Sequence, residues 1–159
     1  MLDRSEVNGG RGRLARFLWG RADEKEAEIA MEHRNKNKSV LVVANNRELQ
    51  YMLSLRLISA GYTVYGAENA VEALELMEKH PVDLVLTDYC MPTMDGLEFL
   101  SVSRMRWPEV PVVILSGERD SHMVQEAVDR GAFAWVRKGA ETTTLMQVVA
   151  LAIPQSVHV

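Results

Sequence analysis

The chain has 159 residues, of which 47% are hydrophobic, and this length predicts one globular domain with a buried core and no second domain. Its formal charge of −4 is uneven: residues 1–38 hold nine Lys and Arg against seven Asp and Glu (+2), whereas residues 39–159 hold nine against fifteen (−6). The acidic globular part argues against a nucleic-acid surface, and no apolar run reaches the roughly 20 residues of a membrane span. Cys90 is the only cysteine and no signal peptide precedes the domain, so we expect a cytoplasmic protein without disulfides.

Residues 1–38 differ from the rest and are predicted to form an N-terminal extension. The segment is rich in helix formers, and Leu14, Phe17 and Leu18 make a short apolar patch at helical spacing. Two interpretations stay open: a frayed, partly helical or disordered tail, or a helix that docks on a partner or a second copy. Seven acids in the segment argue against a membrane-surface helix.

Residues 39–153 alternate between short apolar strands and amphipathic helical stripes. Strands are predicted at residues 40–43, 62–66, 84–86, 110–115 and 133–136. The inward helical faces are Leu49, Met52, Leu53, Leu57 and Ala60; Ala70, Ala73, Leu74 and Met77; Leu97 and Leu100; Val124, Ala127 and Val128; and Leu145, Val148, Val149 and Ala152. This alternation predicts an α/β fold, a doubly wound five-stranded parallel sheet of order 2-1-3-4-5, followed by a C-terminal tail at residues 154–159.

The carboxyl ends of parallel strands meet at one edge of the sheet, so the residues after each strand gather there. Asp88 follows the third strand, Ser116 the fourth and Lys138 the fifth, while Ala44, Asn45 and Asn46 follow the first. Each has an ordinary alternative, because Asp88 and Ser116 can cap a turn or helix and lysines are usually solvated. Their joint placement predicts a polar site instead.

These motifs resemble the receiver domain of two-component response regulators over roughly residues 39–153. The resemblance rests on Val40-Leu41-Val42-Val43, the stretch from Asp83 to Gly96, the stretch from Val112 to Gly117, and the stretch from Gly131 to Lys138. It implies that Asp88 accepts a phosphoryl group from a histidine kinase or phosphotransfer protein. Lys138 and Ser116 would then contact the phosphate, and Trp135 would couple the site to the face formed by the fourth helix, fifth strand and fifth helix.

The chain departs from the family at the acidic pair that binds Mg²⁺, since Ala44 and Asn45 hold those places. The remaining ligands implied by the family are Asp88, the side-chain oxygen of Asn45 and the carbonyl of Cys90, so Mg²⁺ binding is expected to be weakened or absent. Gly139 stands where many receivers have proline, which leaves the isomer of the Lys138–Gly139 bond open.

Two functions follow. The first is a stand-alone receiver that is phosphorylated on Asp88 in a phosphorelay and signals by protein contact. The alternative is a phosphorylation-independent pseudo-receiver that acts as a protein-interaction module. A metabolic enzyme is disfavoured because no glycine-rich phosphate loop follows the first strand. The last helix is apolar nearly all round, which is typical of a buried terminal helix or of an interface. We favour a homodimer or a partner surface at the helix 4, strand 5 and helix 5 face, and cover by the N-terminal segment stays open.

Overall fold

The computed structural model describes residues 25–26, 29, 35–117 and 121–153. Most of the predicted extension, and the tail at residues 154–159, lie outside the described residues. The strands are β1 (Ser39–Val43), β2 (Thr63–Ala67), β3 (Leu84–Asp88), β4 (Val112–Ser116) and β5 (Ala134–Arg137). The helices that follow them in turn are α4 (Arg47–Ser59), α5 (Ala70–Lys79), α6 (Gly96–Arg106), α7 (Ser121–Asp129) and α8 (Thr142–Ala152).

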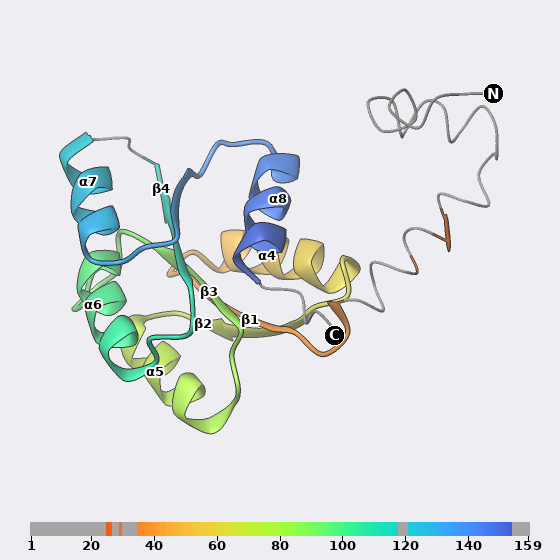
Figure 1. The fold of residues 1–159 in the computed structure, drawn as a ribbon, viewed down its shortest axis with the longest axis horizontal. Coiled ribbons are helices and arrows are strands. Elements are labelled where there is room, and N and C mark those ends of the chain that lie inside the picture. Colours follow the sequence, from red (N-terminus) through yellow and green to blue (C-terminus); the bar gives the residue numbers. More distant parts are fainter. Residues whose placement is uncertain (1–24, 27–28, 30–34, 118–120, 154–159) are drawn as a thin grey trace, which may run out of the picture.

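The five strands form one parallel sheet in the order β2-β1-β3-β4-β5, which confirms the predicted topology. Helices α4 and α8 cover one face of the sheet and α5, α6 and α7 cover the other (Figure 1). The central strands β1, β3 and β4 are buried along their whole length because both faces are covered. Every strand therefore delivers its next residue to the same edge of the sheet.

Two apolar clusters fill the spaces between the sheet and the two helical layers. Phe99, Leu100 and Ala127 pack with Leu41 and Val85 on the side of α5, α6 and α7. On the other side, Leu57 from α4 and Leu145 and Val149 from α8 pack against Val42 and Leu86. Alternate residues of one strand thus serve opposite clusters, as the twofold repeat of a strand requires.

Three helix starts and two helix ends follow the expected capping chemistry. The side chains of Asn46, Asn69 and Asp95 accept hydrogen bonds from backbone amides in the first turns of α4, α5 and α6. Gly61 and Gly131 follow the ends of α4 and α7 with φ of 98° and 95°, a conformation in which a side chain is strained. Gly61 thus ends the first helix, as glycine in a left-handed conformation commonly does.

Two residues assigned to inward faces are exposed, and those assignments are wrong. Met52 is 54% exposed on α4, and Val128 is 57% exposed on α7. Ile153, which is not among the inward residues predicted for the last helix, is buried at 4%. On α4 and α8 the helix is apolar on more than one side, so spacing alone does not say which side meets the sheet, whereas Val128 lies at the margin of the single apolar side of α7. None of the helices within the described ranges is long and apolar enough to cross a membrane.

Candidate functional site

Asp88 is the last residue of β3 and lies at the carboxyl edge in the middle of the sheet. Its strand pairs with β1 on one side and β4 on the other, and Asp88 itself is in register with Leu115. Asp88 is only 3% exposed, and it follows the wholly apolar stretch Leu84–Leu86 of the same strand. An acid in this position is set at the crevice where ligands bind in open α/β sheets.

Lys138 provides the positive charge beside Asp88. Its Nζ lies 2.6 Å from Oδ1 of Asp88, and its side chain is 32% exposed, so the amine approaches from the open side of the site. Oδ1 has no well-aligned hydrogen bond among the described residues, and the contact is an ion pair. The Lys138 backbone amide donates to the carbonyl oxygen of Ser116 at 2.8 Å. This hydrogen bond holds the start of the loop after β5 against the end of β4. No described peptide bond is cis, so the Lys138–Gly139 bond is trans.

Ser116 ends β4, which lies between β3, the strand that carries Asp88, and β5, the strand that Lys138 follows. It is 4% exposed and lies one residue beyond Leu115, the register partner of Asp88. Neighbouring strands are about 4.8 Å apart, so the hydroxyl-bearing residue belongs to the same edge as the acid and the amine. The structure thus assembles Asp88, Ser116 and Lys138 at consecutive strand ends, as the sequence predicted. Glu118, three residues after Leu115, lies outside the described residues.

The loop after β1 contributes no carboxylate to this edge. Ala44 is buried, Asn45 is exposed, and the side chain of Asn46 is used as the cap of α4, accepting from the amides of Glu48 and Leu49 at 2.9 and 3.2 Å. Asn46 therefore has a structural function that its position after β1 did not reveal.

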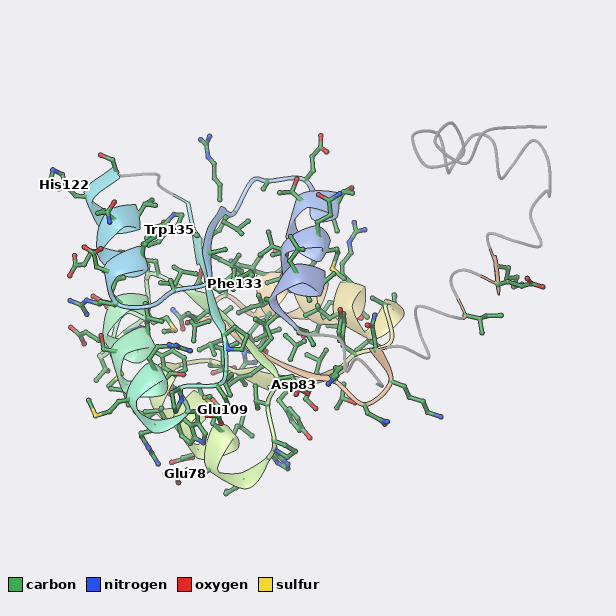
Figure 2. All side chains as sticks on the ribbon, viewed as in Figure 1. Glu78, Asp83, Glu109, His122, Phe133 and Trp135 are labelled. Carbon is green, nitrogen blue, oxygen red and sulfur yellow. The ribbon has the colours of Figure 1, made fainter. Side chains whose placement is uncertain are left out.

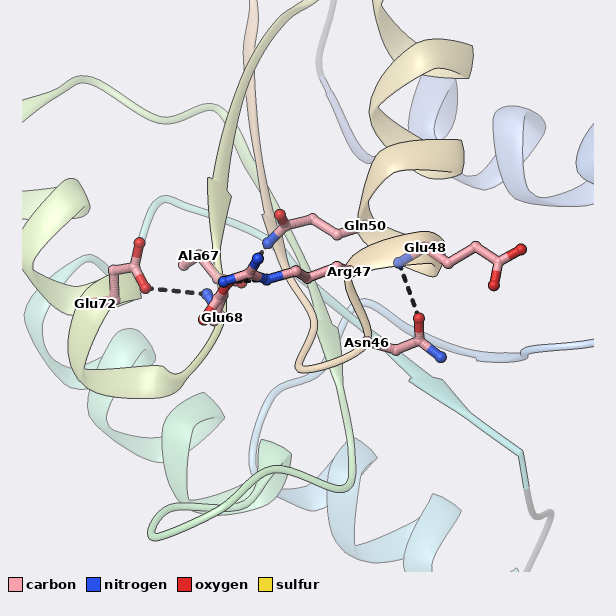
Figure 3. A network of polar contacts seen from close by, with 7 residues as sticks. All are labelled: Asn46, Arg47, Glu48, Gln50, Ala67, Glu68 and Glu72. Carbon is pink, nitrogen blue, oxygen red and sulfur yellow. Dashed lines mark hydrogen bonds and ion pairs between the residues drawn. The ribbon is translucent and has the colours of Figure 1, made fainter.

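Polar contacts tie this loop to the end of β2 (Figure 3). The amide of Ala44 donates to the carbonyl oxygen of Ala67 at 3.0 Å, and Nε2 of Gln50 donates to the same oxygen at 2.7 Å. Nε of Arg47 pairs with Oε1 of Glu68 at 2.8 Å. The spacing of the sequence gave no sign of this network, because its members come from two elements about 20 residues apart.

The donor set does not fit an ordinary Mg²⁺ site. Mg²⁺ prefers several carboxylate and other oxygen ligands in octahedral geometry, and among the predicted ligands Asp88 is the single carboxylate, already paired with the ammonium of Lys138. The other predicted ligands are neutral, and both Asn45 and Cys90 are exposed. Among the described residues no group of three His, Cys, Asp or Glu side chains is arranged to hold a metal.

The loop after β3 passes directly over the backbone of Asp88. The amide of Gly96 donates to the carbonyl oxygen of Tyr89 at 2.8 Å, and a Cβ on Gly96 would lie 2.6 Å from the carbonyl oxygen of Asp88. Thr93, in the middle of this loop, has a φ of 72°. The glycine is therefore required by close approach of two backbone segments rather than by a turn.

Tyr89 and Trp135 form an aromatic pair beside the site. Their ring centroids are 5.6 Å apart at an angle of 46°, and Nε1 of Trp135 is buried without a hydrogen-bond partner among the described residues. Figure 2 shows Trp135 on the side of the sheet nearer α7, while Glu78, Asp83 and Glu109 lie around the opposite edge. Burial raises the pKa of the Tyr89 phenol, and the nearby negative charge of Asp95 raises it further. The sequence singled out Trp135 but not its partner.

Fold and site together define a receiver of response-regulator type. The chain matches the response regulator receiver domain family over residues 40–150, and it belongs to that family. The class is that of two-component signalling, in which receivers interact with histidine kinases or phosphotransfer proteins and typically use Mg²⁺.

Known relatives differ in how much of their own length the chain covers. The chain is 32% identical over 122 residues to the transcriptional regulatory protein GlrR of Escherichia coli K12, covering 77% of this chain but only 28% of that protein. It is 27% identical over 118 residues to the sporulation initiation phosphotransferase F of Bacillus subtilis, covering 74% of this chain and 95% of that protein. The chemotaxis protein CheY4 of Vibrio cholerae superimposes with a TM-score of 0.69 at 31% identity, covering 72% of this chain and 98% of CheY4.

Proposed function

We propose that this receiver accepts a phosphoryl group on Asp88 from a histidine kinase or phosphotransfer protein and signals through contact with a partner protein. The observation that carries the proposal is the buried carboxylate of Asp88 with Nζ of Lys138 at 2.6 Å, at the carboxyl edge of the sheet. Organisation as a stand-alone receiver is part of the proposal: the phosphotransferase relative is covered to 95% of its length, whereas GlrR is covered to only 28%.

The chemistry is a simple displacement. A carboxylate oxygen of Asp88 forms a bond to phosphorus while the bond to the donor breaks, and the product is an acyl phosphate. Lys138 neutralises charge on the transferred group, and Ser116 donates a hydrogen bond to one of its oxygens. Space for the donor is open beside Gly117, where an added Cβ would meet no atom of the described residues within 4 Å.

The charge of the site supports low dependence on Mg²⁺. A site with an additional acidic pair carries excess negative charge that a divalent cation must offset. Within the described part of this edge, the carboxylate of Asp88 and the ammonium of Lys138 already sum to zero. We infer that loss of the two acids and loss of the metal offset one another in charge, so that the transfer proceeds slowly and with little response to Mg²⁺.

Intact mass after incubation with acetyl phosphate, with and without Mg²⁺, tests this function. A phosphate adduct is expected on the native chain, absent from Asp88→Asn, with a rate that Mg²⁺ changes by less than about threefold. Asn45→Asp returns one acid at an exposed, nearly isosteric position and should increase the Mg²⁺ response. An adduct that survives Asp88→Asn would contradict the assignment of Asp88.

The second candidate, a phosphorylation-independent pseudo-receiver, is favoured by one specific observation. Ala44 is buried, Asn45 is exposed and Asn46 caps α4, so the Asp88–Lys138 pair is complete without any group from this loop. Absence of any adduct under conditions that label an ordinary receiver would establish this alternative. The search would then move to a partner bound constitutively.

A further inference from the structure

A pocket lies between α4 and α8, the two helices that cover one face of the sheet in Figure 1. Its volume is about 230 Å³, and its apolar lining comes from Leu49 and Leu53 of α4, Leu115 of β4, Val136 of β5 and Leu145 of α8. An apolar cavity of about 150 Å³ holds one benzene ring, and drug-sized ligands occupy about 300 to 1,000 Å³. The pocket therefore has room for one aromatic ring or a short alkyl chain together with a small head group.

The charged residues that line this pocket are all basic. Arg56, Arg137 and Lys138 belong to the lining, and none of the described Asp and Glu residues does. Residues 39–159 as a whole carry a net charge of −6, so this local group of positive residues is opposite in sign to the domain around it. Charge complementarity therefore favours an anionic ligand in the pocket and disfavours a cationic one.

Two of these three positive charges have no acidic partner in the described part of the chain. Nζ of Lys138 lies 2.6 Å from Oδ1 of Asp88, whereas no ion pair between described residues includes Arg56 or Arg137. Both arginines are exposed. A guanidinium presents a planar set of N–H donors that matches the oxygens of a carboxylate or phosphate. The pocket therefore combines an apolar interior with two guanidinium groups that are available to an oxyanion.

We propose that this pocket binds a small organic acid, with an apolar body of one ring or a short alkyl chain and a single carboxylate or phosphate head group. The apolar body lies between Leu53 and Leu145, and Arg56 and Arg137 bind the head group. Lys138 remains paired with Asp88 and forms the side of the pocket nearest the carboxyl edge. The site is separate from the proposed phosphoryl transfer, and its occupation does not require phosphorylation of Asp88.

Amide chemical-shift titrations of the full chain with 4-phenylbutyrate and with phenyl phosphate test this proposal, since the two probes pair a phenyl ring with different head groups. At least one of them should give saturable shifts at Leu53, Arg56 and Leu145, with a dissociation constant of about 1 mM or below. The tighter of the two identifies the preferred head group. The neutral analogue 4-phenylbutanamide should bind about tenfold more weakly than 4-phenylbutyrate, because it lacks the charge.

Substitutions in the lining locate the binding site. Arg56→Gln and Arg137→Gln should each weaken binding of the acid about fivefold to tenfold and leave binding of the neutral amide unchanged. Arg47→Gln is the matched control, because Arg47 lies on the same helix, has a side chain 85% exposed and is outside the lining. Ala140→Leu adds side-chain volume at a residue of the lining and should abolish binding of the acid and the amide alike.

Three results would overturn the proposal. The first is the absence of saturable shifts at the pocket with either acid, and the second is equal affinity for 4-phenylbutyrate and its neutral amide. The third is an equal loss of affinity in Arg47→Gln and Arg56→Gln, which would show general charge attraction instead of a site. Binding of an acidic Glu-Leu-Glu-Leu peptide without binding of either acid would assign the pocket to a partner protein and would also contradict the proposal.

Discussion

The carboxylate of Asp88 is 3% exposed, and burying a charge costs several kcal/mol unless another charge compensates it. Lys138 provides that compensation at 2.6 Å and keeps a third of its own side chain in water. The amine therefore loses less hydration than the carboxylate does. The negative charge of Asp88 is therefore buried at the carboxyl edge of the sheet. The amine of Lys138 is still able to move towards an added phosphate.

Lys138→Met should lower the free energy of unfolding by about 2 kcal/mol, because Asp88 is left buried and unpaired. Asp88→Asn removes the charge that needs a partner. The double variant should therefore lose less than the sum of the two single variants, by about 1 kcal/mol. Urea denaturation of the four chains measures this coupling, and strictly additive losses would show that the ion pair contributes nothing.

Gly96→Ala should disturb the site through the backbone. The added Cβ would lie 2.6 Å from the carbonyl oxygen of Asp88 and 2.9 Å from Cα of Tyr89, neither of which can rotate away. We expect a loss of about 2 kcal/mol in the free energy of unfolding. Gly117→Ala is the control, because its Cβ would meet nothing within 4 Å. Similar losses for the two variants would contradict a steric origin.

At the scale of the element, α4 serves the site only indirectly. Its N-terminus is held by the Asn46 cap and by the contacts of Gln50 and Arg47 with the end of β2. Its inner side contributes Leu57 to the core, and its outer side also carries exposed apolar side chains. A helix that is apolar on both sides indicates a second contact beyond the sheet.

The helix cap formed by Asn46 should contribute measurably to the stability of the chain. Asn46→Ala should lower the free energy of unfolding by about 1 kcal/mol, because the amides of Glu48 and Leu49 lose their acceptor. Asn46→Asp should keep the stability of the native chain, since aspartate caps a helix equally well. Thermal unfolding compares the two variants, and a stable alanine variant would mean that solvent replaces the cap without loss.

For the whole molecule, ionisation of buried tyrosine limits stability at high pH. Burial raises the pKa of Tyr62, a residue 6% exposed in the cluster beneath α4 and α8, above the ordinary value of 10.0. The neutral phenol is favoured in the folded chain, so its contribution is complete below the unfolded-state pKa and is lost as pH rises through the folded-state pKa.

The urea midpoint should therefore fall between about pH 9 and pH 11, and Tyr62→Phe should make that fall smaller. Tyr51→Phe, at an exposed position, serves as the control for the loss of a hydroxyl. An equal fall in the native chain and in Tyr62→Phe would exclude this phenol as the cause.

The fold could be predicted from sequence because its determinants are local. Apolar runs, such as those before Asp88 and Ser116, mark strands buried on both faces, and helical stripes between them require parallel connections. The convergence of Asp88, Ser116 and Lys138 follows from this topology, since parallel strands share one carboxyl edge. No long-range geometry was needed to bring them together.

Only the tertiary structure decided which neighbours these residues have. The pairing of Lys138 with Asp88, the use of Asn46 as a cap, and the contacts of Gln50 and Arg47 with β2 depend on how far loops reach across the sheet. Periodicity likewise left open which side of α4 meets the core, because that helix is apolar on more than one side. The sequence by itself determined the sheet and the residues at its edge, since these follow from local pattern and strand direction. Side-chain partners depend on contacts between distant segments, which only the folded chain brings within reach.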